Sequence, residues 1–162
     1  MQALPGAGIA NVRGVEEGKA PDVPSPLFQY LNASKLSIAL DTRDTKDRAT
    51  IASLAAWADV VVEDWGPGAL EEAGLDPEAW RAANPRLVVV RISAWGQTGP
   101  WAKRPANDFT LQAASGSLEY RGFPTRDPVA AGGRVVDWVA GTFAAFSGYA
   151  AWRSARRDGA GQ

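Results

Sequence analysis

The chain alternates short apolar runs with segments of helical spacing. Residues 36–40 alternate apolar with small or polar side chains, residues 60–62 are consecutive valines, and residues 87–93 are rich in valine and isoleucine. These three segments are predicted strands, and the all-apolar run at residues 60–62 is typical of a strand covered on both faces.

Helical segments separate the predicted strands. Apolar side chains recur at helical spacing over residues 51–58, after a polar turn at residues 41–45. Residues 69–73 predict a short helix, and Asp76-Pro77 indicates the start of another that ends by Asn84-Pro85. The order of elements predicts an α/β fold, a Rossmann-like parallel sheet with flanking helices.

Two further helices are predicted in the second half of the chain, one from Asn107 to about residue 116 and one over residues 138–156. In the second, Val139, Phe143, Phe146 and Ala150 recur at helical spacing and predict its packed face.

Asp137 stands directly before this helix, at or beside its N-cap. There, free backbone N–H groups and the helix dipole favour an ionised carboxylate. A plain cap is the commoner role for such a residue, but an ionised carboxylate is also what a nucleophile requires. The spacing alone favours the cap.

The ends of the chain are expected to be less ordered than its middle. Residues 1–25 are rich in glycine, alanine and proline and predict an irregular leader, and its Gly6-Ala7-Gly8 run lacks the strand and spacing of a nucleotide-binding loop. Residues 26–156 are expected to form one domain, and residues 157–162 a frayed tail.

A ligand cleft is expected at one edge of the sheet. In parallel sheets, ligands bind beyond the carboxyl ends of the strands. Residues 41–44, 63–68 and 94–100 leave those ends, and they carry turn-forming and polar side chains. The glycines within residues 95–101 are, by themselves, typical of a plain turn.

The amino-acid composition excludes several classes of partner and of catalytic group. The chain is 46% hydrophobic and 22% charged with a net charge of −1, which argues against nucleic acid or a membrane as the main partner. It contains no cysteine and no histidine, so thiol nucleophiles, histidine bases and metal sites built on cysteine or histidine are excluded. No apolar run approaches membrane-spanning length and no signal pattern opens the chain, which predicts a soluble, cytoplasmic protein.

Several segments together resemble the class III CoA-transferase family, which includes formyl-CoA transferase, carnitine CoA-transferases and alpha-methylacyl-CoA racemase. They are NASKLSIALD at residues 32–41, ADVVVEDWGPGAL at 58–70, NPRL at 84–87, GQTGP at 96–100, GGRVVDWVAG at 132–141 and RDGAGQ at 157–162. The resemblance covers residues 26–162. It implies a nucleotide-binding-like fold that binds acyl-CoA at the carboxyl edge of the sheet, and interlocked dimers.

The resemblance also implies roles for individual residues. The catalytic aspartate of the family falls on Asp137, whose carboxylate would attack an acyl-CoA thioester, form an aspartyl anhydride and pass coenzyme A to an acceptor carboxylic acid. No metal is implied. The implied coenzyme A contacts form three sets: Leu40, Asp41, Thr42 and Arg43; Asp64, Trp65 and Gly66; and Pro105, Ala106, Asn107 and Asp108.

For two of these residues a purely structural role stays open as the alternative. Arg43 suits a phosphate, but it is also an ordinary surface arginine. Trp65 suits the adenine or pantetheine of coenzyme A, but it is also an ordinary core or rim tryptophan.

Departures from the family pattern leave alternatives open. Asn107 stands where the racemase branch has a histidine and cannot take up a proton, so racemisation is less favoured. Glu72 and Asp64 place negative charge near an anionic ligand.

Family enzymes are also much longer than this chain. We therefore expect an incomplete fold, a fragment of the N-terminal half that acts as a homodimer or with a chain supplying the rest. The alternative is an inactive remnant that binds coenzyme A or a partner chain.

Overall fold

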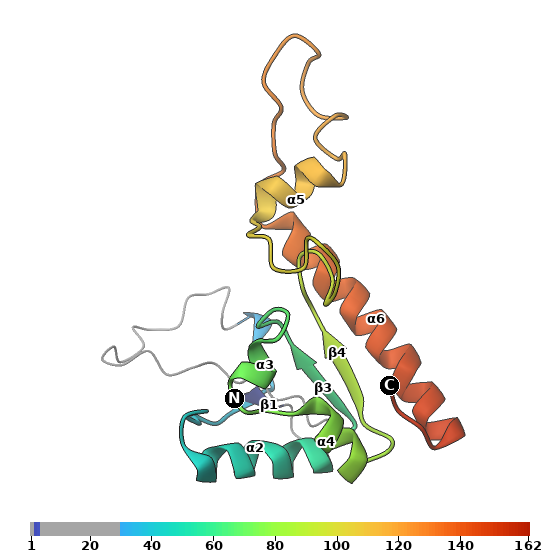
Figure 1. The fold of residues 1–162 in the computed structure, drawn as a ribbon. Helices are drawn as coiled ribbons and strands as arrows, with labels where there is room; N and C mark the ends of the chain where they lie inside the picture. Colours follow the sequence, from blue (N-terminus) through green and yellow to red (C-terminus); the bar gives the residue numbers. More distant parts are fainter. Residues whose placement is uncertain (1, 4–29) are drawn as a thin grey trace.

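A computed structural model describes residues 2–3 and 30–162 of the chain. A small parallel sheet lies between helices, as Figure 1 shows, so the predicted α/β class is confirmed. Apart from Gln2 and Ala3, the predicted leader over residues 1–25, the Gly6-Ala7-Gly8 run and the predicted onset of order at residue 26 lie outside the described residues.

The parallel sheet pairs β3 (Val60–Glu63) with β4 (Val88–Arg91), and each Val60–Val62 residue faces a valine across the pair. Between them run α3 (Ala69–Glu72) and α4 (Pro77–Ala83), and α2 (Thr45–Trp57) comes before β3. The predicted start at Asp76 is confirmed, because Asp76 accepts from the Glu78 backbone N–H, and Asp44 caps α2 by accepting from that of Lys46.

The strand predicted over residues 36–40 is wrong in length and in partner. β2 covers only Leu36–Ser37 and pairs antiparallel with β1 (Gln2–Ala3), which also corrects part of the irregular leader. Beyond β2, the Asp41 N–H donates to the Asp47 side chain of α2 at 2.8 Å. Alternation along one segment does not specify which strand it pairs with.

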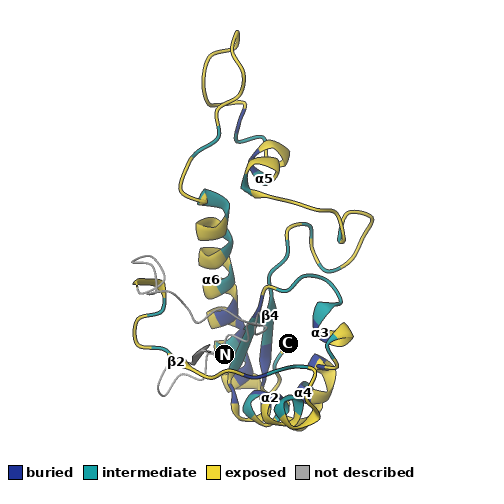
Figure 2. Cartoon of the chain, turned by 90° about the vertical axis from the view of Figure 1, so that its left-hand side faces the viewer, coloured by how far each residue is buried: buried dark blue, intermediate teal, exposed yellow. Residues whose placement is uncertain are grey.

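Alternate residues of the two parallel strands point to opposite faces of the sheet, and they pack into two apolar cores. One core packs the sheet face of Val61, Val89 and the neighbouring Leu87 against α2, α3 and α4, and includes the buried Trp80. The other packs Val60, Val88 and Val90 against α6 (Val135–Asp158). Figure 2 shows the buried residues gathered around this sheet.

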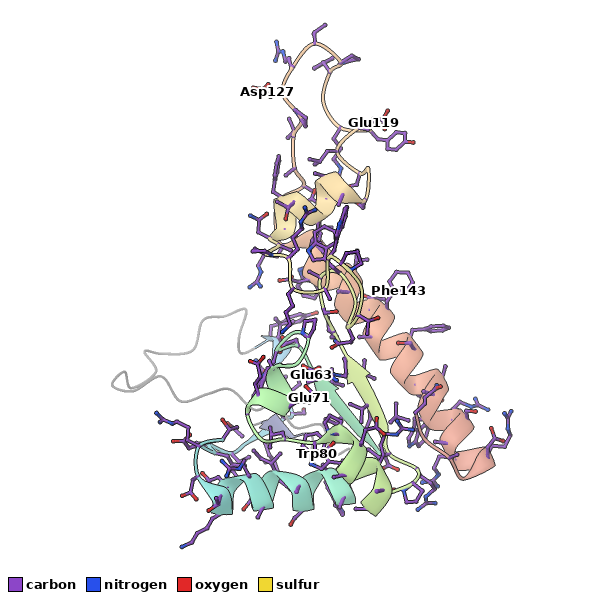
Figure 3. All side chains as sticks on the ribbon, in the orientation of Figure 1. Glu63, Glu71, Trp80, Glu119, Asp127 and Phe143 are labelled. Atoms are coloured by element: carbon purple, nitrogen blue, oxygen red, sulfur yellow. The ribbon has the colours of Figure 1, made fainter. Side chains whose placement is uncertain are left out.

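Helix α6 is present, but its packed face is not the predicted one. Phe143 and Phe146 are 71% and 75% exposed, and Val139 and Ala150 are also exposed. Figure 3 shows Phe143 pointing away from the sheet. The face that meets β4 carries the small residues Gly148, Ala151 and Ala155. Small side chains let the backbone approach so closely that a Cβ on Gly148 would lie 3.0 Å from Val90.

The end of the chain is tied to the sheet, so the predicted frayed tail is wrong. Helix α6 runs to Asp158 and ends at Gly159, which has a positive φ of 78°. The Gly161 N–H then donates to the Pro85 carbonyl at 2.7 Å, and the Val89 N–H donates to the Gln162 carbonyl at 2.9 Å. A side chain at Gly161 would collide with the Leu87 carbonyl, so only glycine fits there.

Helix α5 (Asp108–Ala114) lies beyond the carboxyl ends of the parallel strands, beside the start of α6 (Figure 1). Its predicted start is confirmed: Asn107 accepts from the Thr110 N–H, and Thr110 Oγ1 accepts from the Asn107 N–H, which makes a capping box.

Candidate functional site

Asp137 lies in the first turn of α6, at the end of the molecule toward which the parallel strands run (Figure 1). The prediction that it sits at or beside the N-cap needs one correction. Arg134 is the cap residue, with a positive φ of 55°, and Asp137 is the third helical residue. A carboxylate in the first turn still interacts favourably with the helix dipole.

The Asp137 side chain is half exposed, at 54%, and pairs with Arg134 Nη2 at 2.5 Å. The sequence had not drawn attention to Arg134. Its guanidinium keeps a counter-charge beside the carboxylate while leaving more than half of the side chain open to solvent. The carboxylate is thus accessible to a ligand that approaches the helix start.

The second predicted contact set lines a polar pocket of about 330 Å³ at the carboxyl ends of β3 and β4. Asp64, Trp65 and Gly66 form one wall, and Lys103 and Arg104 form another. Neither cation was singled out from the sequence, although both directly precede the third predicted set. Lys103 Nζ also lies 4.0 Å from Glu72 Oε1, so it offsets the charge that made Glu72 unfavourable.

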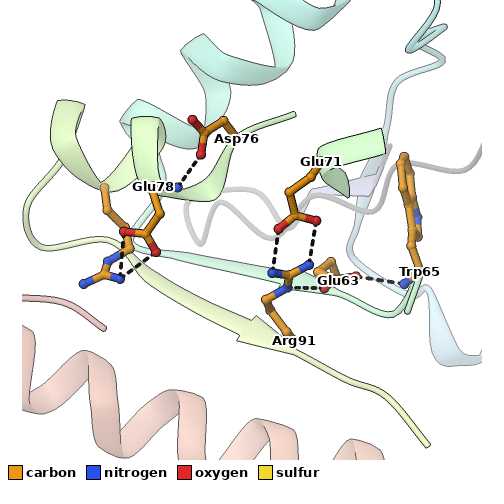
Figure 4. Close-up of polar contacts among 7 residues, drawn as sticks. Glu63, Trp65, Glu71, Asp76, Glu78 and Arg91 are labelled. Carbon is orange, nitrogen blue, oxygen red and sulfur yellow. Dashed lines mark hydrogen bonds and ion pairs between the residues drawn. The ribbon is translucent and has the colours of Figure 1, made fainter. Parts of the chain in front are cut away.

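A buried ion-pair network holds the turn that carries Asp64 and Trp65 (Figure 4). Glu63 is only 7% exposed, accepts from the Trp65 backbone N–H at 2.8 Å and pairs with Arg91 Nε at 2.7 Å. Arg91 also donates to both carboxylate oxygens of Glu71, at 2.8 and 3.1 Å. These hydrogen bonds lower the pKa of Glu71 and raise the pKa of Arg91, so these two groups stay charged at neutral pH.

The first predicted set forms a self-contained turn. Leu40 is buried in the core, and Arg43 binds Asp41 through several hydrogen bonds of 2.9 to 3.1 Å. Hydrogen bonds from the Arg43 side chain hold the pKa of Asp41 below its ordinary value, and the same contact raises the pKa of Arg43. Thr42 accepts from Arg48 through its carbonyl at 2.7 Å. Arg43 is therefore exposed but already paired.

The third predicted set joins α5 to the start of α6. Pro105 and Ala106 are exposed, and Asn107 is used as the α5 cap. Asp108 Oδ1 accepts from the Val136 N–H at 2.9 Å, so it lies next to the turn that carries Asp137. Of the predicted residues, Asp108 thus binds the backbone of the residue that directly precedes Asp137.

Two negative findings limit the site. Among the described residues, no group of three or more acidic side chains is placed to hold a metal ion. No helix in residues 30–162 is long and apolar enough to cross a membrane.

Comparisons with known proteins agree on one family. The sequence profile described as CoA-transferase family III matches residues 7–162. The chain is 37% identical over 135 residues to succinyl-CoA–D-citramalate CoA-transferase of Chloroflexus aurantiacus, covering 83% of the chain and 34% of that protein. It is 38% identical over 135 residues to acetyl-CoA:oxalate CoA-transferase of Acetobacter aceti, covering 83% and 35%.

A solved structure shows the same fold. A CAIB/BAIF family protein from Brucella suis superposes with a TM-score of 0.74 at 36% identity, over 78% of this chain and 33% of that one. The chain therefore spans about a third of the length of the relatives it matches.

Proposed function

Because the chain belongs to CoA-transferase family III, we propose that it moves coenzyme A between carboxylic acids, with Asp137 as the nucleophile that attacks an acyl-CoA. The observation that carries this proposal is the half-exposed Asp137 carboxylate in the first turn of α6, beyond the carboxyl ends of the parallel strands. A polar pocket with two cations lies at the same edge of the sheet.

The proposed reaction begins with attack of an Asp137 oxygen on the thioester carbonyl carbon. A carbon–oxygen bond forms, the carbon–sulfur bond breaks, and coenzyme A leaves as its thiolate. The thiolate attacks the Asp137 side of the resulting anhydride, releases the donor as a free carboxylate and leaves an aspartyl thioester. The acceptor carboxylate repeats these steps in reverse, and Asp137 is regenerated without net proton transfer.

The pocket at the strand ends is the proposed site for the anionic part of coenzyme A. Lys103 and Arg104 supply positive charge, and Trp65 supplies an aromatic surface. Arg104 lies over the Trp101 ring at 4.7 Å, which holds the guanidinium in the loop next to the pocket. Arg43 is a weaker choice because its donors already bind Asp41.

Two other activities receive less support. Racemisation of an acyl-CoA needs a group that exchanges a proton, and Asn107 instead uses its side chain to cap α5. Binding of coenzyme A without transfer is the other outcome that the test below distinguishes. The proposed transfer includes a second chain, or a second copy, that supplies further parts of the site.

The test is acylation of Asp137 itself. The chain, alone and fused to the remaining region of the Acetobacter aceti relative, is incubated with acetyl-, succinyl- or formyl-CoA. The adduct is trapped with hydroxylamine and mapped by mass spectrometry. The parent should carry the adduct at Asp137, and Asp137→Asn should carry none because an amide does not attack a thioester. Undiminished transfer by a folded Asp137→Asn protein would refute the proposed role.

A further inference from the structure

The first turn of α6 takes its cap from another helix. The residue at its own cap position, Arg134, makes no side-chain capping hydrogen bond. The Val136 N–H donates instead to Asp108 Oδ1 at 2.9 Å, which joins residues 28 positions apart. Asp108, the first residue of α5, therefore does for α6 what a capping side chain does for its own helix.

The second oxygen of Asp108 is held by Gln112, which is 1% exposed and lies one turn further along α5. Gln112 Nε2 donates to Asp108 Oδ2 at 2.5 Å and to the Ala131 carbonyl at 3.1 Å. Gln112 Oε1 accepts from the Ala131 N–H at 2.8 Å and from Arg121 Nη1 at 3.0 Å. These partners fix the orientation of the amide, because the oxygen meets two donors and the nitrogen meets two acceptors.

We propose that Asp108 and Gln112 form a positioning pair that sets the first turn of α6 and, through it, the Asp137 carboxylate. Gln112 fixes both the incoming loop at Ala131 and the carboxylate of Asp108, and Asp108 fixes Val136. Asp137 is the next residue along the chain. The role of Asp137 as nucleophile rests on the proposed function, whereas the pair itself rests on the contacts alone.

The hydrogen bonds of the pair require a carboxylate at Asp108 and an amide at Gln112. Both oxygens of Asp108 accept, one from Val136 and one from Gln112. Asp108→Asn presents an amide group to one of these donors, and Gln112→Glu presents a carboxylate to the Asp108 carboxylate. Each single change therefore breaks the pair.

The exchanged pair, Asp108→Asn with Gln112→Glu, restores it. The new amide donates to the new carboxylate and still accepts from Val136, and the net charge is unchanged. The donation to the Ala131 carbonyl is lost, and a carboxylate oxygen then faces that carbonyl, which makes the exchanged pair less stable than the parent.

The test measures amide hydrogen exchange of Val136 by NMR in the full chain without any acyl-CoA, and the rate at which a water-soluble carbodiimide labels Asp137. Each single variant should speed Val136 exchange by about tenfold or more, the factor expected for loss of a hydrogen bond to a charged group. It should also change the labelling rate of Asp137. The exchanged pair should slow Val136 exchange below that of either single variant, and it should move the labelling rate of Asp137 back toward the parent value.

Ser117→Ala serves as the matched control, because Ser117 Oγ binds the backbone carbonyl of Gln112 and not the pair. It should leave both rates at the parent value. Unchanged Val136 exchange in both single variants, or an exchanged pair as unprotected as they are, would overturn the inference.

If the single variants do not fold, the exchanged pair decides: protection of Val136 supports the pairing, and failure to fold overturns it. Since no acyl-CoA is present, failure of Asp137 acylation leaves this test intact. The converse result is acylation of Asp137 in the parent while the exchange rate of Val136 is the same in the parent and the single variants. That result would refute the positioning pair and leave the proposed function standing.

Discussion

Replacing Arg91 by leucine tests how the turn beside the polar pocket is held. Arg91 is the cation between Glu63 and Glu71, and its side chain is 23% exposed while that of Glu63 is 5% exposed. Removing one partner of a buried ion pair costs about 3–5 kcal/mol, because the other charge stays buried without compensation. Since Arg91 is partly open to solvent, we expect a loss near the lower end, about 3 kcal/mol of unfolding free energy.

The double variant Glu63→Gln with Arg91→Leu separates the lost charge pair from lost packing. Its glutamine oxygen can still accept from the Trp65 N–H, and this hydrogen bond does not involve Arg91. The neutral amide nitrogen is left without a partner, and Glu71, which also loses Arg91, is 47% exposed and can be solvated by water, so we expect a smaller loss of about 1–2 kcal/mol. If the loss came from packing of the arginine stem, the double variant would be no more stable than the single one.

The assay is urea unfolding at neutral pH, followed by tryptophan fluorescence, since Trp80 is buried in the core. Arg81→Leu is the matched control, because it makes the same chemical change in an ion pair whose partner Glu78 is 80% exposed. That control should stay within about 0.5 kcal/mol of the parent. A loss below about 1 kcal/mol in Arg91→Leu, or equal losses in the single and double variants, would refute the reasoning.

Three further predictions follow from the same structure. Gly161→Ala should lower the unfolding free energy by about 1–3 kcal/mol in urea unfolding, because its Cβ would collide with the Leu87 carbonyl; an unchanged midpoint would contradict this. Lys103→Ala should weaken coenzyme A binding in calorimetry, with a smaller effect at high salt, whereas equal affinity would place the phosphates elsewhere. Because Arg91 lowers the pKa of Glu71, its stabilisation is present above pH 4.5 and lost as the pH falls through the lowered pKa. Glu71→Gln should therefore be less stable than the parent at neutral pH, and a difference that persisted unchanged in acid would contradict this.

Local patterns predicted most of the elements. Three consecutive valines, the capping aspartates and the Asp76-Pro77 start specify β3, α2 and α4 through neighbouring residues alone. The packed face of α6 could not be predicted in this way. Large side chains at helical spacing suggested a core, but the sheet is met by glycine and alanine because β4 approaches the helix backbone closely.

The candidate site also contains some residues that local sequence predicts and others that it does not. The turn at Asp64 and the acid at Asp137 follow from strand ends and a helix start. Lys103, Arg134 and Gln112 could not be predicted, because their importance depends on long-range contacts. Gln112, for example, reaches Ala131 across 19 residues, and a buried glutamine has no sequence signature of its own.

The uneven burial seen in Figure 2 has a consequence for how the chain opens. Helix α5 and the start of α6 lie away from the two apolar cores, and they are joined to the sheet through the rest of α6 and through the segment that follows β4. We therefore expect the end that carries Asp137 to open as a separate cooperative unit, without exposing the core around Leu87. A ligand bound there would stabilise that unit by mass action, so protection against hydrogen exchange should rise around Asp108 and Val136 while the sheet stays unchanged.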